Sequence, residues 1–88
     1  GVPKNYDEKI KADLLERLGD QLVKVGKLNE ALSYYERRRR YYAHQDELSQ
    51  ASLLLKIGQV HGNLRNIEQG IRYLKKARSY LEMFSKIF

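Results

Sequence analysis

Apolar side chains recur along this chain at intervals of three and four residues, which is the period of an α-helix. No segment shows the alternation of apolar and polar positions that marks a half-buried β-strand. The clearest stripe runs over about residues 6–25 and comprises Ile10, Leu14 or Leu15, Leu18, Leu22 and Val25. We expect this stripe to be the face by which a first helix packs on its neighbour.

The same period predicts three further helices. Gly26 is placed to end the first one, because glycine adopts the left-handed conformation of a helix C-terminus at little cost. A second helix then extends to about residue 44, a third begins near residue 46, and a fourth runs from about residue 67 to near residue 88. Connections this short force neighbouring helices to run antiparallel. The expected fold is all-α, one domain of two helix–turn–helix hairpins over about residues 6–45 and 46–88.

The two hairpins share a pattern of residues. Leu15-x-x-Leu18-Gly19-x-x-Leu22 in the first is matched 39 positions later by Leu54-x-x-Ile57-Gly58-x-x-His61. Twelve residues after each glycine comes another small residue, Ala31 or Gly70. A glycine in the middle of a helix costs about 1 kcal/mol relative to alanine, so two such glycines in matched settings need a compensating contact. We expect each to allow close approach of its partner helix.

This pattern resembles the tetratricopeptide repeat. The matching positions are Leu18-Gly19, Ala31 and Tyr35 in the first hairpin and Ile57-Gly58, Gly70 and Leu74 in the second. The long period is similar to that of the kinesin light chains and the Pins-type adaptors. Arg65 stands where the pattern has its turn glycine, and Arg38 stands where it has a small packing residue. The resemblance implies an α-solenoid that serves as an adaptor or scaffold and binds another protein.

In arrays of this family, the first helix of each hairpin lines a concave groove that holds a peptide. Counting roughly 100° per residue gives the candidate groove residues. They are Asp13, Glu16, Arg17, Asp20 and Lys24, followed by Ser52, Leu55, Lys56, Gln59 and Asn63. The carboxylate clamp of the chaperone-binding members is not present, because Glu16, Leu55, Asp20 and Gln59 occupy its positions. We therefore expect a peptide of mixed charge, whose affinity changes when Arg17 and Lys56 are reversed to glutamate.

The fourth helix is expected to carry a second interaction surface. Its stripe toward the third helix is Ile71, Leu74, Ala77, Leu81, Phe84 and Phe88. A further stripe of Tyr73, Tyr80 and Ile87, spaced by seven, extends beyond what the third helix can cover. Exposed apolar patches mark interaction sites, so we expect self-association through this stripe or contact with further repeats. We interpret the chain as a fragment of a longer protein, since Gly1 is a common scar of tag removal.

Charge suggests one alternative function. The 88 residues include 17 Lys and Arg against 11 Asp and Glu, a formal charge of +6. The segment Arg37–Arg40, bracketed by tyrosines, favours a nucleic-acid-binding helical module. Four successive helical residues point in directions roughly 100° apart, however, and do not form one patch. A steep fall in affinity for generic RNA or DNA with rising salt would distinguish this alternative from protein binding.

Catalytic and cofactor chemistry have no candidate residues in this chain. It contains no cysteine, no glycine-rich phosphate loop and no serine in a nucleophile elbow. Its histidines, His44 and His61, lack the i,i+4 spacing of a helical metal pair. No apolar run approaches the ~20 residues of a membrane span. We predict a non-enzymatic protein that binds no metal, cofactor or membrane and works in the cytoplasm.

Overall fold

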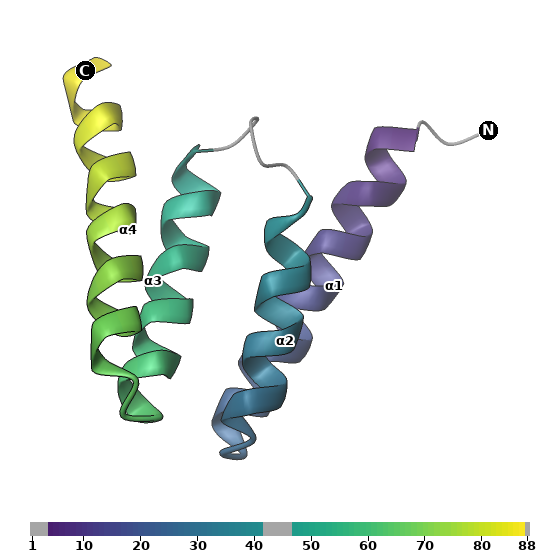
Figure 1. Cartoon of the computed structure of the whole chain (residues 1–88). Helices are drawn as coiled ribbons and strands as arrows, with labels where there is room; N and C mark the ends of the chain where they lie inside the picture. The colour runs from purple at the N-terminus through teal and green to yellow at the C-terminus, as the bar shows by residue number, and fades with distance from the viewer. Residues whose placement is uncertain (1–3, 42–46, 88) are drawn as a thin grey trace. The chain divides into compact units, whose positions relative to one another are not determined.

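Four helices make up the described part of the chain in the computed structural model shown in Figure 1. The structure describes residues 4–41 and 47–87, and the side chains of residues 7–41 and 47–83. The helices are α1 (Lys4–Lys24), α2 (Leu28–Arg39), α3 (Glu47–Asn63) and α4 (Ile67–Ile87). The described residues contain no strand, so the predicted all-α class is confirmed. Among the helices of this described part, none has the length and apolar character needed to cross a bilayer.

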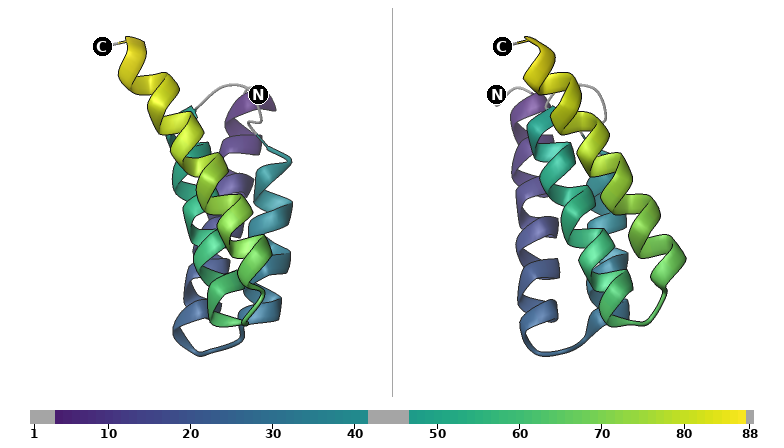
Figure 2. Two further views of the ribbon diagram at one scale, coloured as in Figure 1. Left: turned by 60° about the vertical axis from the view of Figure 1, so that its left-hand side comes forward. Right: turned by 90° about the vertical axis from the view of Figure 1, so that its left-hand side faces the viewer.

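The helices pair in chain order. α1 packs against α2 and α3 packs against α4, and the views of Figures 1 and 2 agree in showing each pair side by side. The chain divides into two compact units, residues 1–43 and 44–88, each containing one pair. The two predicted hairpins are therefore confirmed.

The second helix is shorter than the sequence predicts, because it ends at Arg39 rather than near residue 44. The N–H groups of Arg40 and Tyr41 donate to the carbonyls of Arg37 and Arg38, three residues back, at 3.3 and 3.1 Å. Bonds of this type tighten a last turn and end an α-helix. The apolar period continues through this point, so the pattern gives no signal of the end. The predicted junction with the third helix, residues 42–46, lies outside the described residues.

The turns within the two hairpins are built alike. Gly26 follows α1 with φ +80°, and Arg65, which lies 39 positions later, follows α3 with φ +69°. The backbone hydrogen bonds of the two turns correspond one to one. The N–H groups of Gly26 and Lys27 donate to the carbonyls of Val23 and Leu22 at 3.0 and 2.9 Å. The N–H groups of Arg65 and Asn66 donate to the carbonyls of Gly62 and His61 at 3.0 and 2.8 Å. This is the Schellman arrangement, which satisfies the last carbonyls of a helix. The 39-residue period thus appears in the backbone, and the predicted helix stop at Gly26 is confirmed.

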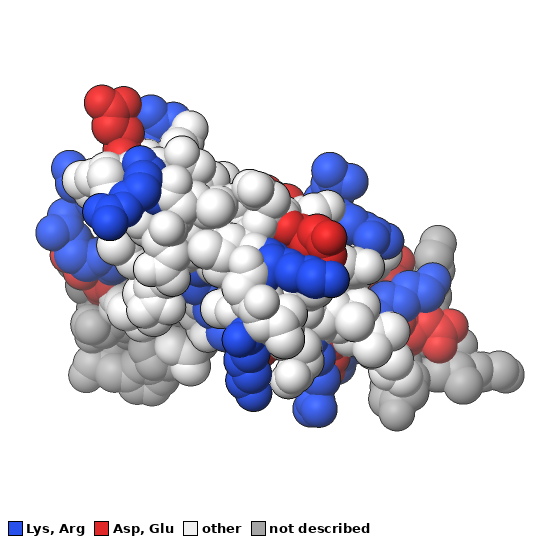
Figure 3. All heavy atoms as spheres, turned by 90° about the horizontal axis from the view of Figure 1, so that it is seen from below, with Lys and Arg blue, Asp and Glu red and all other residues white. Residues whose placement is uncertain are grey.

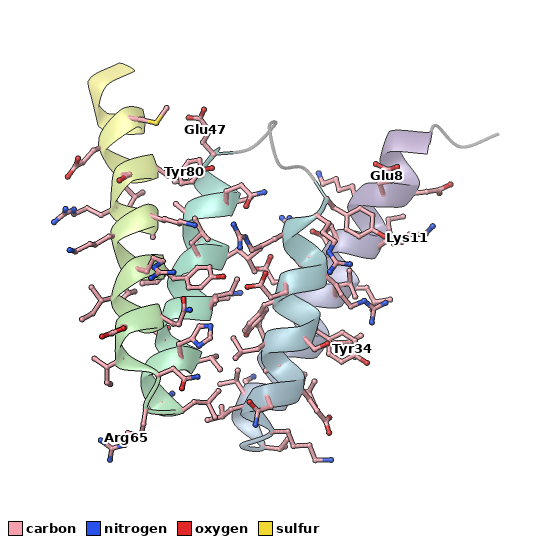
Figure 4. All side chains as sticks on the ribbon, viewed as in Figure 1. Glu8, Lys11, Tyr34, Glu47, Arg65 and Tyr80 are labelled. Atoms are coloured by element: carbon pink, nitrogen blue, oxygen red, sulfur yellow. The ribbon has the colours of Figure 1, made fainter. Side chains whose placement is uncertain are left out.

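Arg65 adopts a conformation that suits glycine better than arginine. A left-handed backbone costs an L-residue with a side chain about 1–2 kcal/mol, and Figure 4 shows Arg65 at the tip of its hairpin, pointing away from the helices. We expect Arg65→Gly to raise the free energy of unfolding by roughly 0.5–1 kcal/mol. Urea unfolding followed by circular dichroism measures this change.

The matched control is Gly26→Ala, which places a side chain in the same left-handed conformation of the other turn. This variant should lose stability while Arg65→Gly gains it. If Arg65→Gly is no more stable than the wild type, the strain assigned to Arg65 is wrong.

Both repeated glycines lie where the partner helix comes close. A Cβ on Gly19 would lie 2.5 Å from Cε1 of Tyr35. A Cβ on Gly58 would lie 2.9 Å from Cγ of Leu74 and 3.1 Å from the carbonyl oxygen of Gly70. The predicted close approach is confirmed in both hairpins. Gly70 faces Gly58 as expected, whereas the nearest atoms to Gly19 belong to Tyr35 rather than to Ala31.

α1 buries a different arc from the predicted one. Ala12, Leu15 and Gly19 are buried, and Leu22 is half-buried. The other predicted stripe members, Ile10, Leu14, Leu18 and Val25, are exposed, Leu14 to 57%. Small residues set the contact, because Ala12 and Gly19 let α2 approach more closely than a row of leucines would. α1 carries apolar residues on two arcs, and the period alone does not choose between them.

α4 also turns an unexpected arc toward α3. Gly70 and Ala77 are buried, Tyr73 and Tyr80 are half-buried, and the Tyr73 ring stacks on His61 with centroids 5.4 Å apart. Of the stripe predicted to pack, Ala77 is buried and Leu74 lies against Gly58 of α3, whereas Ile71 and Leu81 are exposed. Gly70 sets the closest approach of the helices, which brings its flanking tyrosines toward α3. The exposed apolar surface of α4 is therefore not the predicted tyrosine stripe; the side chains of Phe84, Ile87 and Phe88 lie outside the described residues.

Candidate binding groove

An open apolar groove runs between α3 and α4 of the second hairpin. It encloses about 400 Å³. Both helices contribute equally to its lining: Leu48, Ala51, Ser52 and Leu55 come from α3, and Leu74, Ala77, Arg78 and Leu81 come from α4. Only Ser52 and Arg78 bring polar groups to this surface, which we call the α3–α4 groove.

The groove is hollow because small side chains form its floor. Ala51 and Ala77 are 3% and 4% exposed and lie at the bottom of the groove. Their short side chains fill little of the space between the two helices. Leucines stand on either side and remain accessible, Leu55 to 44%. Burying a fully exposed leucine contributes about 1.5–3 kcal/mol, and these leucines have 39–51% of their surface left to cover. A partner segment that lies on these leucines therefore gains stabilisation from several side chains at once.

The first hairpin has charged residues at the equivalent positions. Glu16 precedes Leu55 by 39 residues, and Arg38 precedes Ala77 by the same number. Nε of Arg38 lies 3.2 Å from Oε1 of Glu16, and Arg38 is 4% exposed. The guanidinium of Arg38 also donates from Nη1 to the carbonyl of Tyr41 at 3.3 Å. An ion pair thus stands in the first hairpin where the second has two apolar side chains and an open groove.

A second polar contact accompanies this ion pair. The Tyr35 hydroxyl donates to Oδ1 of Asp20 at 2.6 Å, and Tyr35 is 2% exposed. Burial raises the pKa of Tyr35 well above its ordinary value of 10.0, and the hydrogen bond and the negative charge of Asp20 add to that rise. In the second hairpin the corresponding residues are Leu74 and Gln59, which cannot repeat this chemistry.

The raised pKa of Tyr35 predicts a loss of stability at alkaline pH. The unfolded tyrosine ionises near 10.0, while the folded one keeps its proton. Folding therefore keeps its full contribution from Tyr35 below about pH 10 and loses it progressively above that value. Urea unfolding between about pH 8 and pH 11 should show this decline in the wild type. Tyr35→Phe should decline less steeply, and identical slopes for the two proteins would contradict the prediction.

The predicted groove residues are distributed over both hairpins, which form separate compact units. Ser52 and Leu55 line the α3–α4 groove, whereas Lys56, Gln59 and Asn63 are not among its lining residues. Asp13, Arg17 and Lys24 are exposed on α1. Glu16 and Asp20 were expected opposite the packing side of α1, and that placement is wrong, because each contacts a buried residue of α2. Their role in peptide binding stays a prediction without structural support.

Most of the groove was missed by the sequence argument. Leu74, Ala77 and Leu81 were assigned to packing between α3 and α4, and Leu48 and Arg78 were assigned no binding role. One signal could have identified the groove. Aligning the hairpins at 39 residues shows a charged pair in one replaced by Leu55 and Ala77 in the other. A pair of apolar residues at positions that accommodate an ion pair indicates a surface that is not fully covered.

The arginine segment of α2 is divided between different environments. Arg38 is buried against Glu16, Nη1 of Arg39 lies 3.4 Å from Oε2 of Glu36, and the Arg37 guanidinium lies 5.4 Å from the centroid of the Tyr34 ring. Figure 3 shows basic side chains scattered between acidic and uncharged ones on the face it presents. These arrangements do not gather Arg37–Arg40 into one basic patch, so no observation favours nucleic-acid binding over protein binding.

Metal ligands are not clustered in the described part of the chain, where no three His, Cys, Asp or Glu side chains are placed to share an ion. His61 instead contacts its own hairpin. Its ring stacks on Tyr73 with an interplanar angle of 12°, and its Nδ1 lies 3.3 Å from Nδ2 of Asn66. These contacts explain His61 as part of the packing between α3 and α4. His44 lies outside the described residues.

Comparisons with known proteins leave the geometry as the basis for a functional argument. No protein-family model, no curated protein and no solved structure matches this chain.

Proposed function

We propose that this chain is a non-enzymatic protein-interaction module of the tetratricopeptide type, which holds a segment of another protein. The observation that carries the proposal is the α3–α4 groove, an apolar hollow of about 400 Å³ on the surface of a small domain. Contiguous exposed apolar surface of this kind marks interaction sites in soluble proteins. The repeated hairpin with its 39-residue period supports the family assignment.

The chemistry of the groove suits binding. Leu48, Leu55, Leu74 and Leu81 provide most of the accessible surface, and the polar groups are a serine hydroxyl and a guanidinium. The lining contains no histidine or carboxylate, the side chains that most often serve in general acid–base catalysis. Apolar contact, with a few polar groups to fix orientation, is the pattern of a recognition site.

Selection of peptides on the whole chain tests this proposal. A display library of random linear peptides of about 16 residues would be panned against the wild type, and the recovered peptides measured by fluorescence anisotropy. Leu55→Glu places a carboxylate on the groove wall and should weaken binding at least about ten-fold. Leu55 is already accessible, so the variant should stay folded.

Two controls separate the groove from the surface that the sequence suggests. Gln59→Glu introduces the same side chain one turn further along α3, outside the groove lining, and should leave affinity within about three-fold. The pair Arg17→Glu and Lys56→Glu tests the predicted concave surface. The proposal is wrong if no selected peptide responds to Leu55→Glu, and the location is wrong if only the charge reversals weaken binding.

A further inference from the structure

Resting on this proposed function, we infer that the segment held by the α3–α4 groove is an amphipathic α-helix with acidic residues beside its apolar stripe. The inference concerns the conformation and the charge of the partner, and the two follow from different observations.

The apolar lining of the groove indicates which conformation the partner segment adopts. An extended peptide carries an N–H and a C=O at every residue, and each needs a hydrogen-bond partner when it is buried. The groove offers it only Ser52 and Arg78, because the backbone groups in the middle of α3 and α4 are bonded within their own helices. A helix brings its backbone already paired. An apolar groove between two helices therefore accepts a third helix and disfavours a strand.

The spacing of the leucines fits the same occupant. Leu48 and Leu55 are seven residues apart on α3, and Leu74 and Leu81 are seven apart on α4. Seven residues are two helical turns, about 10.5 Å of axis. A partner helix with apolar residues at i, i+4 and i+7 presents a stripe of the same length. The alanine floor, Ala51 and Ala77, leaves room for its side chains between the rows.

The charged residue that α4 brings to the groove indicates which residues of the partner flank its apolar stripe. Arg78 is the charged residue of the lining, and its Nε lies 3.5 Å from Oε1 of Glu82 in an i,i+4 pair. Both side chains are more than 60% exposed, and an ion pair in that setting holds its partners weakly. Arg78 can therefore exchange Glu82 for a carboxylate of the ligand. This complementarity favours acidic residues beside the apolar stripe of the partner.

The first hairpin carries charged side chains at the equivalent positions. It has the same helix pair and turn, yet Arg38 and Glu16 stand at the positions of Ala77 and Leu55 and pair with each other. The counterpart of Arg78 in the first hairpin is Arg39, whose Nη1 lies 3.4 Å from Oε2 of Glu36. The partner helix would bring a carboxylate to Arg78 and lie over the apolar positions where the first hairpin carries its own ion pair.

Peptides recovered by the selection above test both parts of the inference on the whole chain. We expect their apolar residues to follow the i, i+4, i+7 pattern and their circular dichroism to become more helical on binding. A proline at the centre of such a peptide should weaken binding more than about ten-fold, because it breaks the helix. If the proline is tolerated while Leu55→Glu still abolishes binding, the groove is a binding site but its ligand is not a helix.

A charge exchange tests the acidic flank. Arg78→Glu should weaken the selected peptides at least about ten-fold, and replacing their glutamates and aspartates by lysine should restore affinity for that variant. Lys75→Glu is the matched control, since Lys75 lies on α4 outside the groove lining, and it should change affinity less than about three-fold in physiological salt. Equal effects of the two reversals would overturn the assignment of Arg78.

A second copy of the chain is the competing occupant. Sedimentation of the wild type and of Leu55→Glu across a concentration series measures whether the chain self-associates through the groove. We expect both to remain monomeric at the concentrations used for peptide binding. Self-association of the wild type that Leu55→Glu abolishes would overturn the inference, because the groove would then be occupied by this chain itself.

Discussion

Replacing Gly58 with leucine is expected to destabilise the second hairpin by more than about 1 kcal/mol, although leucine is the better helix former. The reason is that a Cβ at this position would lie 3.1 Å from the carbonyl oxygen of Gly70, a backbone atom that cannot move without shifting α4. Gly19→Leu should also destabilise, because its Cβ would overlap the buried ring of Tyr35. Urea unfolding followed by circular dichroism gives both changes in the free energy of unfolding.

Gly62→Ala is the matched control for these substitutions. Gly62 lies on α3 one turn beyond Gly58, and a Cβ there meets no atom within 4 Å. Helix propensity then acts alone, and the variant should gain up to about 1 kcal/mol. If Gly19→Leu and Gly58→Leu unfold at higher denaturant than the wild type, close helix contact is not the reason for the repeated glycines.

Removing Glu16 alone is expected to cost about 3 kcal/mol, because Arg38 would keep its buried charge without the carboxylate. The wild-type pair is separated by 3.2 Å, and Arg38 is among the most buried polar residues of the described chain. Glu16→Leu introduces the residue that the second hairpin carries at the same place, Leu55. Arg38→Met removes the charge and keeps most of the volume.

The double variant Glu16→Leu/Arg38→Met should recover most of the stability that Glu16→Leu loses. A buried ion pair contributes little more than well-packed apolar residues of similar volume, so the double variant should lie within about 1.5 kcal/mol of the wild type. A double-mutant cycle in urea isolates the coupling between the two side chains. Additive losses would show that Glu16 and Arg38 act independently and that the ion pair does not hold this position.

The features of the fold that local chemistry controls could be predicted from the sequence. Helical period gave four helices, short connections gave two hairpins, and Gly26 ended the first helix as expected. The glycines at 19 and 58 also lie at helix contacts, because a costly residue repeated in the same setting implies a structural requirement. Arg65 shows the limit of local chemistry, since only its alignment with Gly26, 39 positions earlier, indicates the left-handed turn conformation.

The buried arcs could not be predicted, because the choice depends on two helices at once. On α1, Ile10, Leu18 and Val25 belong to the predicted stripe but are exposed, and Ala12, which lies outside that stripe, is buried. The closest contact is set by the smallest side chains, and their matching on the partner helix is a tertiary property. The α3–α4 groove was missed for the same reason, since Leu74 and Leu81 were assumed to be covered once α4 packed on α3.

The proposal that the α3–α4 groove holds a partner is tested most directly by methyl chemical-shift mapping with a selected peptide. The account predicts that the methyl signals of Leu48, Leu55, Leu74 and Leu81 shift on titration, and that Leu15 and Leu22 of the first hairpin do not. Leu55→Glu should abolish the remaining shifts at the same peptide concentration. Shifts confined to the first hairpin, or unchanged groove methyls in the presence of a bound peptide, would contradict the account.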